Sequence, residues 1–240
     1  MTKKLLLATA ILGANLLYAE HWGYTGAGAP ENWAKIDKKS FMCAEGSNQS
    51  PINLTGFTES ELPAIGFNYN LNSSKILNNG HTVQVDITNG SSITVDDIVF
   101  DLKQFHFHTP SENNINGNSY PLEAHFVHAS KNGELAVVAV MFEEGEENEA
   151  LTELWAKMPA KKGDTHSIDA KALNALLPKD RDYYRFNGSL TTPPCTEGVR
   201  WLVMKKPLSI SKSQIASFAT VVHGHNNRPV QATNARAILQ

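Results

Sequence analysis

Two histidines that alternate with aromatic residues are the first feature of this chain that could do chemistry. They lie in the segment Gln104-Phe105-His106-Phe107-His108. On a β-strand, residues two apart share a face, so Gln104, His106 and His108 point one way and the two phenylalanines point the other. Two imidazoles placed like this can lean toward one cation, but a first-row metal needs at least one more protein ligand.

A third histidine lies on the next apolar segment, which reads Leu122-Glu123-Ala124-His125-Phe126-Val127-His128. On a neighbouring strand His125 can face the first pair, and Glu123 shares its face, whereas His128 points to the opposite side. A ligating imidazole usually gives its second N–H to a carboxylate, amide or carbonyl, and Glu123 and Gln104 are suitable partners. Three neutral imidazoles with such partners indicate a zinc site. The alternative is that these residues are ordinary surface or core histidines that bind no metal.

Short alternating segments in the middle of the chain indicate the strands that must position these histidines. Apolar and polar residues alternate there, and clusters of Asn, Gly, Ser and Pro separate the segments. The predicted strands cover residues 81–88, 93–100, 102–108, 122–128 and 135–142, with an Asn89-Gly90 hairpin turn between the first two. Helical periodicity is confined to residues 147–158, 167–177 and about 209–222. We expect one mainly β (α+β) domain with a large antiparallel sheet.

Composition and charge exclude several classes of protein. The 240 residues are 41% hydrophobic and 19% charged, so the chain can bury a core and is not generally disordered. The net charge of −3 provides no basic face that could hold a phosphate backbone. Nucleic acid is therefore not an expected partner.

The first residues have the pattern of a secretory signal peptide. Lys3 and Lys4 precede the apolar residues 5–17, a stretch too short to span a bilayer core that needs about 20 residues. Cleavage is expected after Ala19, although Leu17 is large for its position and leaves an uncleaved anchor as the alternative. Removing two of 21 basic residues and none of 24 acidic ones gives 19 − 24 = −5. We expect an exported, periplasmic or secreted protein without a membrane span.

Export also bears on the only two cysteines, Cys43 and Cys195. An oxidising compartment makes a disulfide between them the expected state, and two unpaired buried thiols are the alternative. Two cysteines cannot form a four-thiolate zinc site.

Further motifs lie around the histidines and along nearly the whole chain. The site motifs are QFHFH at 104–108, Thr109-Pro110-Ser111-Glu112, EAHFVH at 123–128 and SLTTPPC at 189–195. The others are Trp22-Gly23-Tyr24, Pro30-Glu31-Asn32-Trp33, Gln49-Ser50-Pro51-Ile52-Asn53, Asn78-Asn79-Gly80-His81 and Asn227-Arg228-Pro229-Val230-Gln231. In this order they resemble the alpha-class carbonic anhydrases, in particular the exported bacterial branch.

The resemblance implies a single domain at residues 20–240, built on a twisted, mostly antiparallel sheet of about ten strands with a few peripheral helices. It implies the reversible hydration of carbon dioxide to bicarbonate and a proton by attack of a zinc-bound hydroxide. Bound water ionises near pH 7 in this family, a value that belongs to carbonic anhydrase itself and is not inferred from this sequence. It further implies inhibition by sulfonamides and anions, and a possible homodimer.

The resemblance also assigns roles to residues at the centre of the site. It makes His106, His108 and His125 the Zn²⁺ ligands, which leaves the fourth tetrahedral position to water. It pairs Thr191 with Glu112: an ionised carboxylate only accepts hydrogen bonds, so Thr191 donates to it and keeps its oxygen as an acceptor for the hydroxide.

The pocket and the proton path complete the set of predicted site residues. Because carbon dioxide is small and apolar, an apolar wall suits it. The resemblance assigns this wall to Val127, Val137, Leu190, Val199 and Trp201, with Thr192 at the edge. Each hydration releases a proton, and His81 matches the family's histidine shuttle, with Tyr24, Asn79 and Gln84 as neighbours that organise water. Strict alternation would place His81 with the core side of its strand, so we expect the strand to begin after His81.

Two other functions fit parts of the pattern. The spacing His106-x-His108-x3-Glu112 matches a cupin metal motif, but Phe100 and Ser119 stand where that family expects glycine. A catalytically silent binding module on the same scaffold is the other alternative, although such relatives typically lack a ligand histidine. Metal content separates these possibilities, because a cupin more often prefers iron or manganese.

Overall fold

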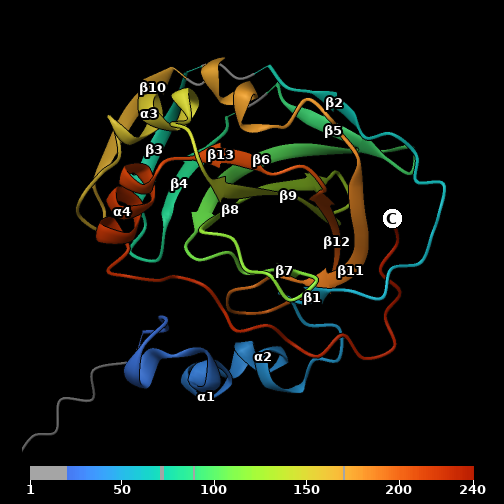
Figure 1. Ribbon diagram of the computed structural model, residues 1–240. Coiled ribbons are helices and arrows are strands. Elements are labelled where there is room, and N and C mark those ends of the chain that lie inside the picture. Colours follow the sequence, from blue (N-terminus) through green and yellow to red (C-terminus); the bar gives the residue numbers. More distant parts are fainter. Residues whose placement is uncertain (1–20, 71–72, 89, 170) are drawn as a thin grey trace, which may run out of the picture.

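The computed structural model describes residues 21–70, 73–88, 90–169 and 171–240, so the predicted signal peptide lies outside the described residues. Figure 1 shows one large curved sheet with helices at its edges. Eleven strands form this sheet in the order β10-β3-β4-β6-β8-β9-β12-β11, with β5 joined to β6, β2 joined to β5 and β13 joined to β9. Most neighbours are antiparallel, but β9 runs parallel to β12 and β13. The mainly β fold expected from the sequence is confirmed.

The strands have the following bounds: β1 Asn53–Leu54, β2 Gly66–Asn68, β3 Ser73–Asn78, β4 Val83–Asp86, β5 Ser92–Val95, β6 Ile98–His108, β7 Asn114–Ile115, β8 Leu122–Ser130, β9 Leu135–Glu144, β10 Thr165–Asp169, β11 Tyr183–Ser189, β12 Glu197–Met204 and β13 Leu208–Ile210. The α-helices are α1 Trp33–Ile36, α2 Met42–Glu45, α3 Glu149–Trp155 and α4 Lys212–Val221. Four short 3-10 helices cover Gly26–Gly28, Pro30–Asn32, Lys38–Ser40 and Lys171–Leu176.

Strands β6, β8 and β9 form the centre of the sheet and separate two apolar clusters. On one face Phe105, Phe107 and Phe126 are fully buried, and Phe107 packs against Trp155 of α3 and Phe218 of α4. Residues of β9 and β12 build the smaller cluster on the other face. Because successive side chains of a strand alternate between faces, the histidines of β6 point away from the phenylalanines and toward the smaller cluster.

The structure differs from the sequence prediction at the strand expected for residues 93–100. Asp96 and Asp97 have φ angles of 52° and 60°, and Val95 pairs with Ile98, so a two-residue turn divides this segment between β5 and β6. Positive φ at both central residues is the conformation of the tight hairpin turn that matches strand twist. The predicted hairpin at Asn89-Gly90 is wrong, because β4 and β5 each pair with β6; Asn89 itself lies outside the described residues.

One of the three predicted helices is also wrong. Residues 167–177 divide into strand β10 and a 3-10 helix, because β10 finds a long antiparallel partner in β3 and tertiary pairing outweighs local propensity. The other two predicted helices are present but shorter. Asn148 caps α3 by accepting from Leu151 N at 3.1 Å, and Ser211 caps α4 in a capping box with Gln214.

A disulfide and a buried arginine connect the N-terminal segment before the sheet to segments late in the sequence. Cys43 and Cys195 form the expected disulfide. The guanidinium of Arg228, which is only 2% exposed, donates to Cys43 O, Gln49 Oε1 and Ser50 O at 2.7–2.9 Å. These contacts hold α2 and the following loop against residues that are close to the C-terminus.

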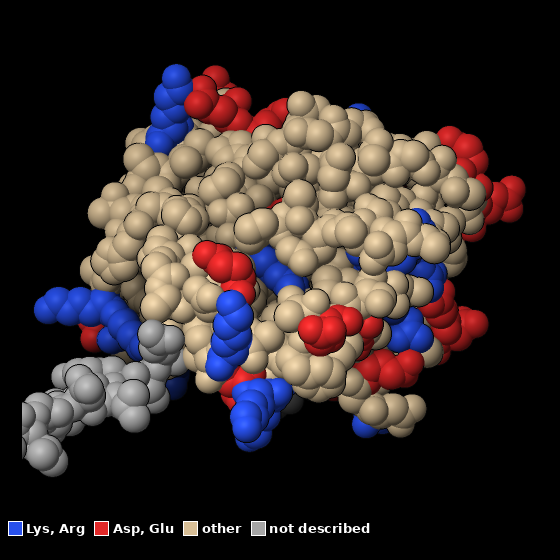
Figure 2. Space-filling model, turned by 90° about the horizontal axis from the view of Figure 1, so that it is seen from below, with Lys and Arg blue, Asp and Glu red and all other residues tan. Residues whose placement is uncertain are grey.

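Helix length and the distribution of charge describe the surface of this part of the chain. None of the described helices combines the length and the apolar character that a bilayer crossing requires. On the face seen in Figure 2, acidic and basic side chains are interspersed rather than gathered into a region of one sign.

We expect reduction of the disulfide to lower thermal stability, because Cys43 and Cys195 close a loop of 152 residues. Removing such a bond typically costs about 2–4 kcal/mol, and each kcal/mol shifts Tm by about 2–4 °C for a domain of this size. Differential scanning calorimetry with and without a reductant measures the loss. The Cys43→Ser/Cys195→Ser variant is the control, since its Tm should already be lowered and should not respond to the reductant. A parental Tm that is unchanged by complete reduction contradicts the prediction.

Candidate metal centre

Three histidines from two adjacent strands converge on one face of the sheet. His106 lies directly opposite His125 in the register between β6 and β8, and His108 is two residues further along β6. One ring nitrogen of each histidine lies within 4.8 Å of the others, and the ring centroids are 4.7–5.4 Å apart. This is the only group of at least three metal-ligating side chains within the described ranges.

Hydrogen bonds decide which nitrogen of the two β6 histidines stays free. His106 Nδ1 lies 2.8 Å from Gln104 Oε1, and His108 Nδ1 lies 2.7 Å from the carbonyl oxygen of Asn226. A carbonyl oxygen can only accept, so each Nδ1 carries the proton and each Nε2 keeps its lone pair. His108 Nε2 is buried and has no hydrogen-bond partner, which is unusual for a native interior and indicates an absent ligand.

His125 is oriented the other way round. Its Nε2 contacts Glu123 Oε1 at 2.9 Å, so its Nδ1 is the nitrogen that faces the other two rings. Glu123 is itself held firmly: its Oε2 accepts from the backbone N–H groups of Glu112 and Asn113 at 2.7 and 2.8 Å, and its Oε1 accepts from Asn113 Nδ2 at 2.8 Å. A fixed carboxylate behind an imidazole fixes the orientation of the ring.

The environment keeps all three imidazoles neutral. Burial lowers the pKa of His106, His108 and His125 below the usual histidine value, and for His106 and His125 the neighbouring His108 adds to the effect. Burial disfavours the charged form of a basic group. Neutral rings with free lone pairs are the form in which histidine binds a metal.

Glu112 lies beside the histidine cluster without being part of it. Its Oε2 is 3.5 Å from His108 Nε2 and 3.8 Å from His125 Nδ1, while its Oε1 accepts from Arg228 N at 2.8 Å. Burial raises the pKa of Glu112 well above its usual value, and hydrogen bonds from the Arg228 backbone and the Thr191 side chain oppose this rise. Thr191 is also buried, at 5% exposed. Glu112, the acceptor of the predicted Thr191–Glu112 pair, therefore lies beside nitrogens of His108 and His125.

The five apolar residues predicted for the pocket wall fall into one cluster. Val137, Val199 and Trp201 are buried in the smaller apolar cluster, and Val127 and Leu190 pack against it. The ring of Trp201 lies edge-on to His125 with 4.9 Å between centroids, and its Nε1 donates to Ser189 O at 3.0 Å. Thr192 is half-buried, in the turn closed by the bond from Cys195 N to Thr192 O at 2.8 Å.

His81 precedes its strand, since β4 begins at Val83. Asn79 Oδ1 accepts from His81 N at 2.8 Å, and Asn79 Nδ2 donates to Gln84 Oε1 at 3.3 Å. The imidazole lies flat on Trp22, with centroids 3.6 Å apart and planes inclined by 7°. Burial, followed by the charges of His21 and Lys162, lowers the pKa of His81 to about 4. In this stacked orientation His81 is neutral at pH 7.

Tyr24 is half-buried and lies edge-on to Trp33 and to Trp22, the residue that stacks on His81. Burial, followed by the negative charge of Glu112, raises its pKa well above the usual tyrosine value. The phenol therefore stays protonated.

His128 belongs to the opposite face, as its position in β8 predicts. It is fully buried, its Nε2 lies 2.7 Å from Tyr69 Oη, and its Nδ1 lies 3.3 Å from Ala136 O. Both nitrogens are thus occupied within the core. Burial lowers the pKa of His128 to about 4, and the ring has no part in the candidate site.

Two residues that contact the site escape the sequence analysis as site residues. Asn226 supplies the carbonyl that holds His108, and Arg228 supplies the backbone N–H that holds Glu112. Both lie more than 100 positions after their partners, and both contacts use backbone atoms, which any residue type could provide. The adjacent Asn-Arg-Pro motif at 227–229 is the one sequence feature that points to this segment.

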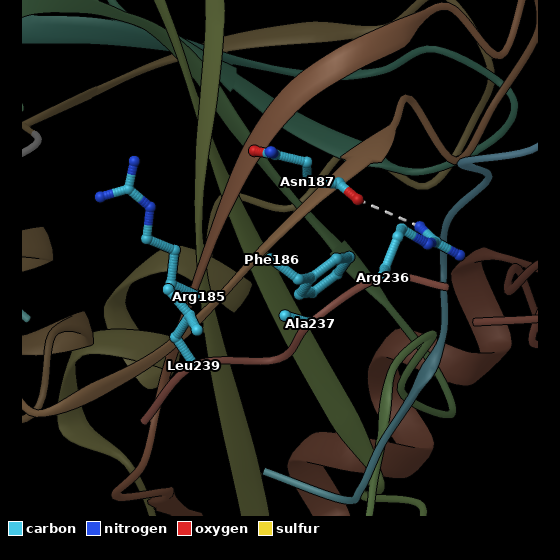
Figure 3. A pocket seen from close by; sticks show the side chains of 6 residues that line it. All are labelled: Arg185, Phe186, Asn187, Arg236, Ala237 and Leu239. Carbon is cyan, nitrogen blue, oxygen red and sulfur yellow. Dashed lines mark hydrogen bonds between the residues drawn. The ribbon is translucent and has the colours of Figure 1, made fainter. Parts of the chain in front are cut away.

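A separate surface hollow lies outside the candidate site formed around the three histidines. Figure 3 shows it between β11 and the C-terminal segment, lined by Arg185, Phe186, Asn187, Arg236, Ala237 and Leu239. Arg236 donates to Asn187 O at 3.1 Å across it. None of the predicted site residues lines this hollow.

Comparison with known proteins agrees with this geometry. Residues 28–240 match the family model described as eukaryotic-type carbonic anhydrase. The chain is 46% identical to a carbonic anhydrase of Neisseria gonorrhoeae, with 100% of this chain and 96% of the relative covered. It resembles the solved alpha-carbonic anhydrase of Thermovibrio ammonificans in complex with sulfanilamide, with a TM-score of 0.87, 44% identity, and 92% and 99% of the two chains covered.

A second solved structure, the alpha-carbonic anhydrase of Photobacterium profundum, gives a TM-score of 0.85 with 49% identity, and covers 92% of this chain and all of its own. These matches extend over nearly the whole described chain and do not support the cupin alternative. The chain belongs to the alpha carbonic anhydrases, the enzymes that interconvert carbon dioxide and bicarbonate.

Proposed function

We propose that this enzyme hydrates carbon dioxide with one Zn²⁺ ion held by His106 Nε2, His108 Nε2 and His125 Nδ1. The observation that carries the proposal is the convergence of three free ring nitrogens within 4.8 Å, each on an imidazole whose other nitrogen faces an oxygen acceptor. Three neutral imidazoles are a known catalytic zinc set that leaves one position open. Bound zinc would supply hydroxide at neutral pH by lowering the pKa of water to about 7, the value established for carbonic anhydrase itself.

The protein residues aim the nucleophile. A cation held by the histidines would lie close to Glu112 Oε2 and favour its ionised form, against the effect of burial. An ionised carboxylate only accepts, so the Thr191 hydroxyl gives its proton to Glu112 and turns its oxygen lone pairs toward the site. The nucleophile can then donate to Thr191, which directs a lone pair toward the substrate.

The smaller apolar cluster provides the place for the substrate. Val127, Val137, Leu190, Val199 and Trp201 belong to this cluster or pack against it, and the ring of Trp201 contacts His125. Carbon dioxide has no net charge or dipole, so such a wall holds it without competing for the polar groups. The charged product gains less from an apolar surface, which favours its release.

The proton released in each cycle needs a carrier, and we propose His81. Its stacked orientation gives a pKa of about 4, which is too low for efficient transfer near pH 7. A ring turned away from Trp22 into solvent would regain a pKa near 6.5. We therefore propose that His81 takes up the proton in the unstacked orientation, while Asn79 and Gln84 keep the turn and its water in place.

Stopped-flow acidification of buffer saturated with carbon dioxide, together with metal analysis, tests the proposed function. We expect one zinc per chain, rapid hydration, loss of activity after chelation, and recovery with Zn²⁺. The sulfanilamide complex of the Thermovibrio ammonificans enzyme supports inhibition by sulfonamides here as well. A silent binding module would carry no stoichiometric metal, and such a result would refute the proposal.

We expect His81→Ala to slow turnover at low buffer concentration and to leave kcat/KM nearly unchanged, because only the proton-transfer step depends on the shuttle. Added imidazole should restore kcat. The expected loss is about 10- to 100-fold, at the low end of what positioned proton transfer contributes. His166→Ala, which removes an exposed histidine, is the matched control. Equal losses in kcat and kcat/KM would exclude a shuttle role.

The chain is further proposed to be exported to the periplasm or secreted. Its disulfide and its bacterial carbonic anhydrase relatives support this location. Signal cleavage after Ala19 and a homodimer stay predictions.

A further inference from the structure

Asn226, in the loop that follows α4, uses every one of its polar atoms inside the protein. It is only 1% exposed. Its backbone N donates to Thr109 O at 3.1 Å, and its carbonyl accepts from His108 Nδ1 at 2.7 Å. Its side-chain Oδ1 accepts from Thr109 N at 2.8 Å, and its Nδ2 donates to Phe107 O at 2.9 Å and to His81 O at 3.1 Å. Two donor protons and one accepting oxygen are thus all occupied.

These partners belong to two different parts of the candidate site. Phe107, His108 and Thr109 form the end of β6 and the residue after it, where one of the metal ligands lies. His81 belongs to the turn before β4, which carries the proposed proton carrier. The Nδ2 atom of Asn226 therefore bridges the backbone of the ligand strand and the backbone of the shuttle turn through its two N–H groups.

The bridge made by Asn226 holds the backbone of His81, whereas the stacking contact with Trp22 holds only its ring. Trp22 holds the imidazole ring, and the ring must leave this partner to reach solvent. Asn79 Oδ1 accepts from His81 N and Thr82 N, but these bonds lie within the turn itself. Asn226 instead fastens the His81 carbonyl to a segment 145 positions away, so the base of the side chain keeps its position when the ring moves.

We propose that the Asn226 side chain is a positioning residue that couples the metal ligand His108 to the turn that carries His81. A shift of the ligand strand moves Asn226, because the carbonyl of Asn226 holds His108, and the amide of the same residue then moves the His81 backbone. The inference rests on the proposed function of the two histidines. It predicts that one side chain affects both metal retention and proton transfer.

Two substitutions at this position and one matched control test the coupling. Asn226→Ala removes the whole amide, and Asn226→Asp keeps the acceptor for Thr109 N but loses both donations. Asn78→Ala is the control, because Asn78 is a buried asparagine that holds the same turn from its other side. Asn78 Nδ2 donates to Pro159 O at 3.2 Å and Asn78 Oδ1 accepts from Gly80 N at 2.9 Å.

The measurements are the rate of zinc release to a chelator, kcat against buffer concentration, and the NMR shift of the His81 amide when Zn²⁺ is added to apo-protein. We expect both Asn226 variants to release zinc about 10-fold faster, at the low end of the effect of losing a group that supports a metal ligand. Their kcat at low buffer should fall and be rescued by imidazole. Asn78→Ala should affect kcat but leave zinc release at the parental rate. The His81 amide should shift on zinc addition in the parent, and less in the Asn226 variants.

Parental zinc release in the Asn226 variants would overturn the coupling, and so would equally fast release from Asn78→Ala, which would indicate general loosening. If neither Asn226 variant folds, the zinc-induced shift of the His81 amide in the parent decides: its presence supports the coupling and its absence refutes it. A parent that binds no zinc or hydrates no carbon dioxide overturns the proposed function itself, which is a different result.

Discussion

Replacing His106 with alanine should abolish tight zinc binding and carbon dioxide hydration together. The His106 side chain is half-buried at the candidate metal centre, its Nδ1 faces Gln104 Oε1, and its Nε2 is one of three nitrogens that converge. With two imidazoles left, the site no longer provides the three protein ligands of a catalytic zinc centre. Loss of a group that only supports a ligand costs about 10- to 100-fold, so loss of a ligand should lower kcat/KM by more than about 100-fold.

Metal analysis after dialysis and stopped-flow hydration measure this effect in the same sample. His128→Ala is the matched control, since His128 is a fully buried histidine that lies on the same strand as His125 but on the opposite face. It should lose stability, because Tyr69 Oη and Ala136 O lose their partner, and should retain one zinc and the parental activity. A His106→Ala protein with full activity and no zinc would show that the ligand assignment is wrong.

The cluster of three histidines could be predicted largely because strand geometry has a period of two. The alternation at 104–108 places the histidines and phenylalanines of β6 on opposite faces, and the same parity separates His125 from His128 in β8. A sequence alone shows no register, but an antiparallel pairing that buries both apolar faces puts His125 on the same face as the first pair. The observed register puts His125 directly opposite His106.

Contacts made by backbone atoms from distant segments could not be predicted in this way. The carbonyl of Asn226 and the amide of Arg228 hold His108 and Glu112, and neither contact depends on the residue type that supplies it. The low pKa of His81 likewise follows from burial and from the proximity of His21 and Lys162, and no periodicity in the sequence links these two residues to the turn before β4.

Local patterns failed where tertiary pairing decided the outcome. Residues 167–177 have helical periodicity, but the pairing of β10 with β3 converts the first part of this segment into an edge strand. Apolar residues on both sides of Asp96 and Asp97 suggest one continuous strand, but these two adjacent aspartates interrupt the alternation and adopt the positive φ of a tight turn. Neither error involves a predicted site residue, and the three clustered histidines lie on the long central strands β6 and β8.

The pair formed by Thr191 and Glu112 should respond to substitution as one unit. Hydrogen bonding from the Thr191 side chain opposes the rise that burial causes in the pKa of Glu112, and Thr191 is the donor of the proposed bond because an ionised carboxylate only accepts. In Thr191→Ala the nucleophile loses its acceptor and its orientation, and misplacement of this kind costs about 100-fold. In Glu112→Gln the amide can keep the bond from Arg228 N, but its NH₂ group presents a donor to Thr191 where an acceptor is needed.

We therefore expect each single variant to lose about 100-fold in kcat/KM, and the Thr191→Ala/Glu112→Gln double variant to lose little more, because the second change removes an orientation that is already lost. Thr191→Ser is the matched control: it keeps the hydroxyl and should stay within about 10-fold of the parent, well short of the loss that misplacement produces. All four proteins should retain one zinc, since neither residue is a proposed ligand. Stopped-flow kinetics in a double-mutant cycle measure the coupling. Losses that multiply would mean that the two side chains act independently, and a serine variant as slow as the alanine variant would mean that the hydroxyl does not orient the nucleophile.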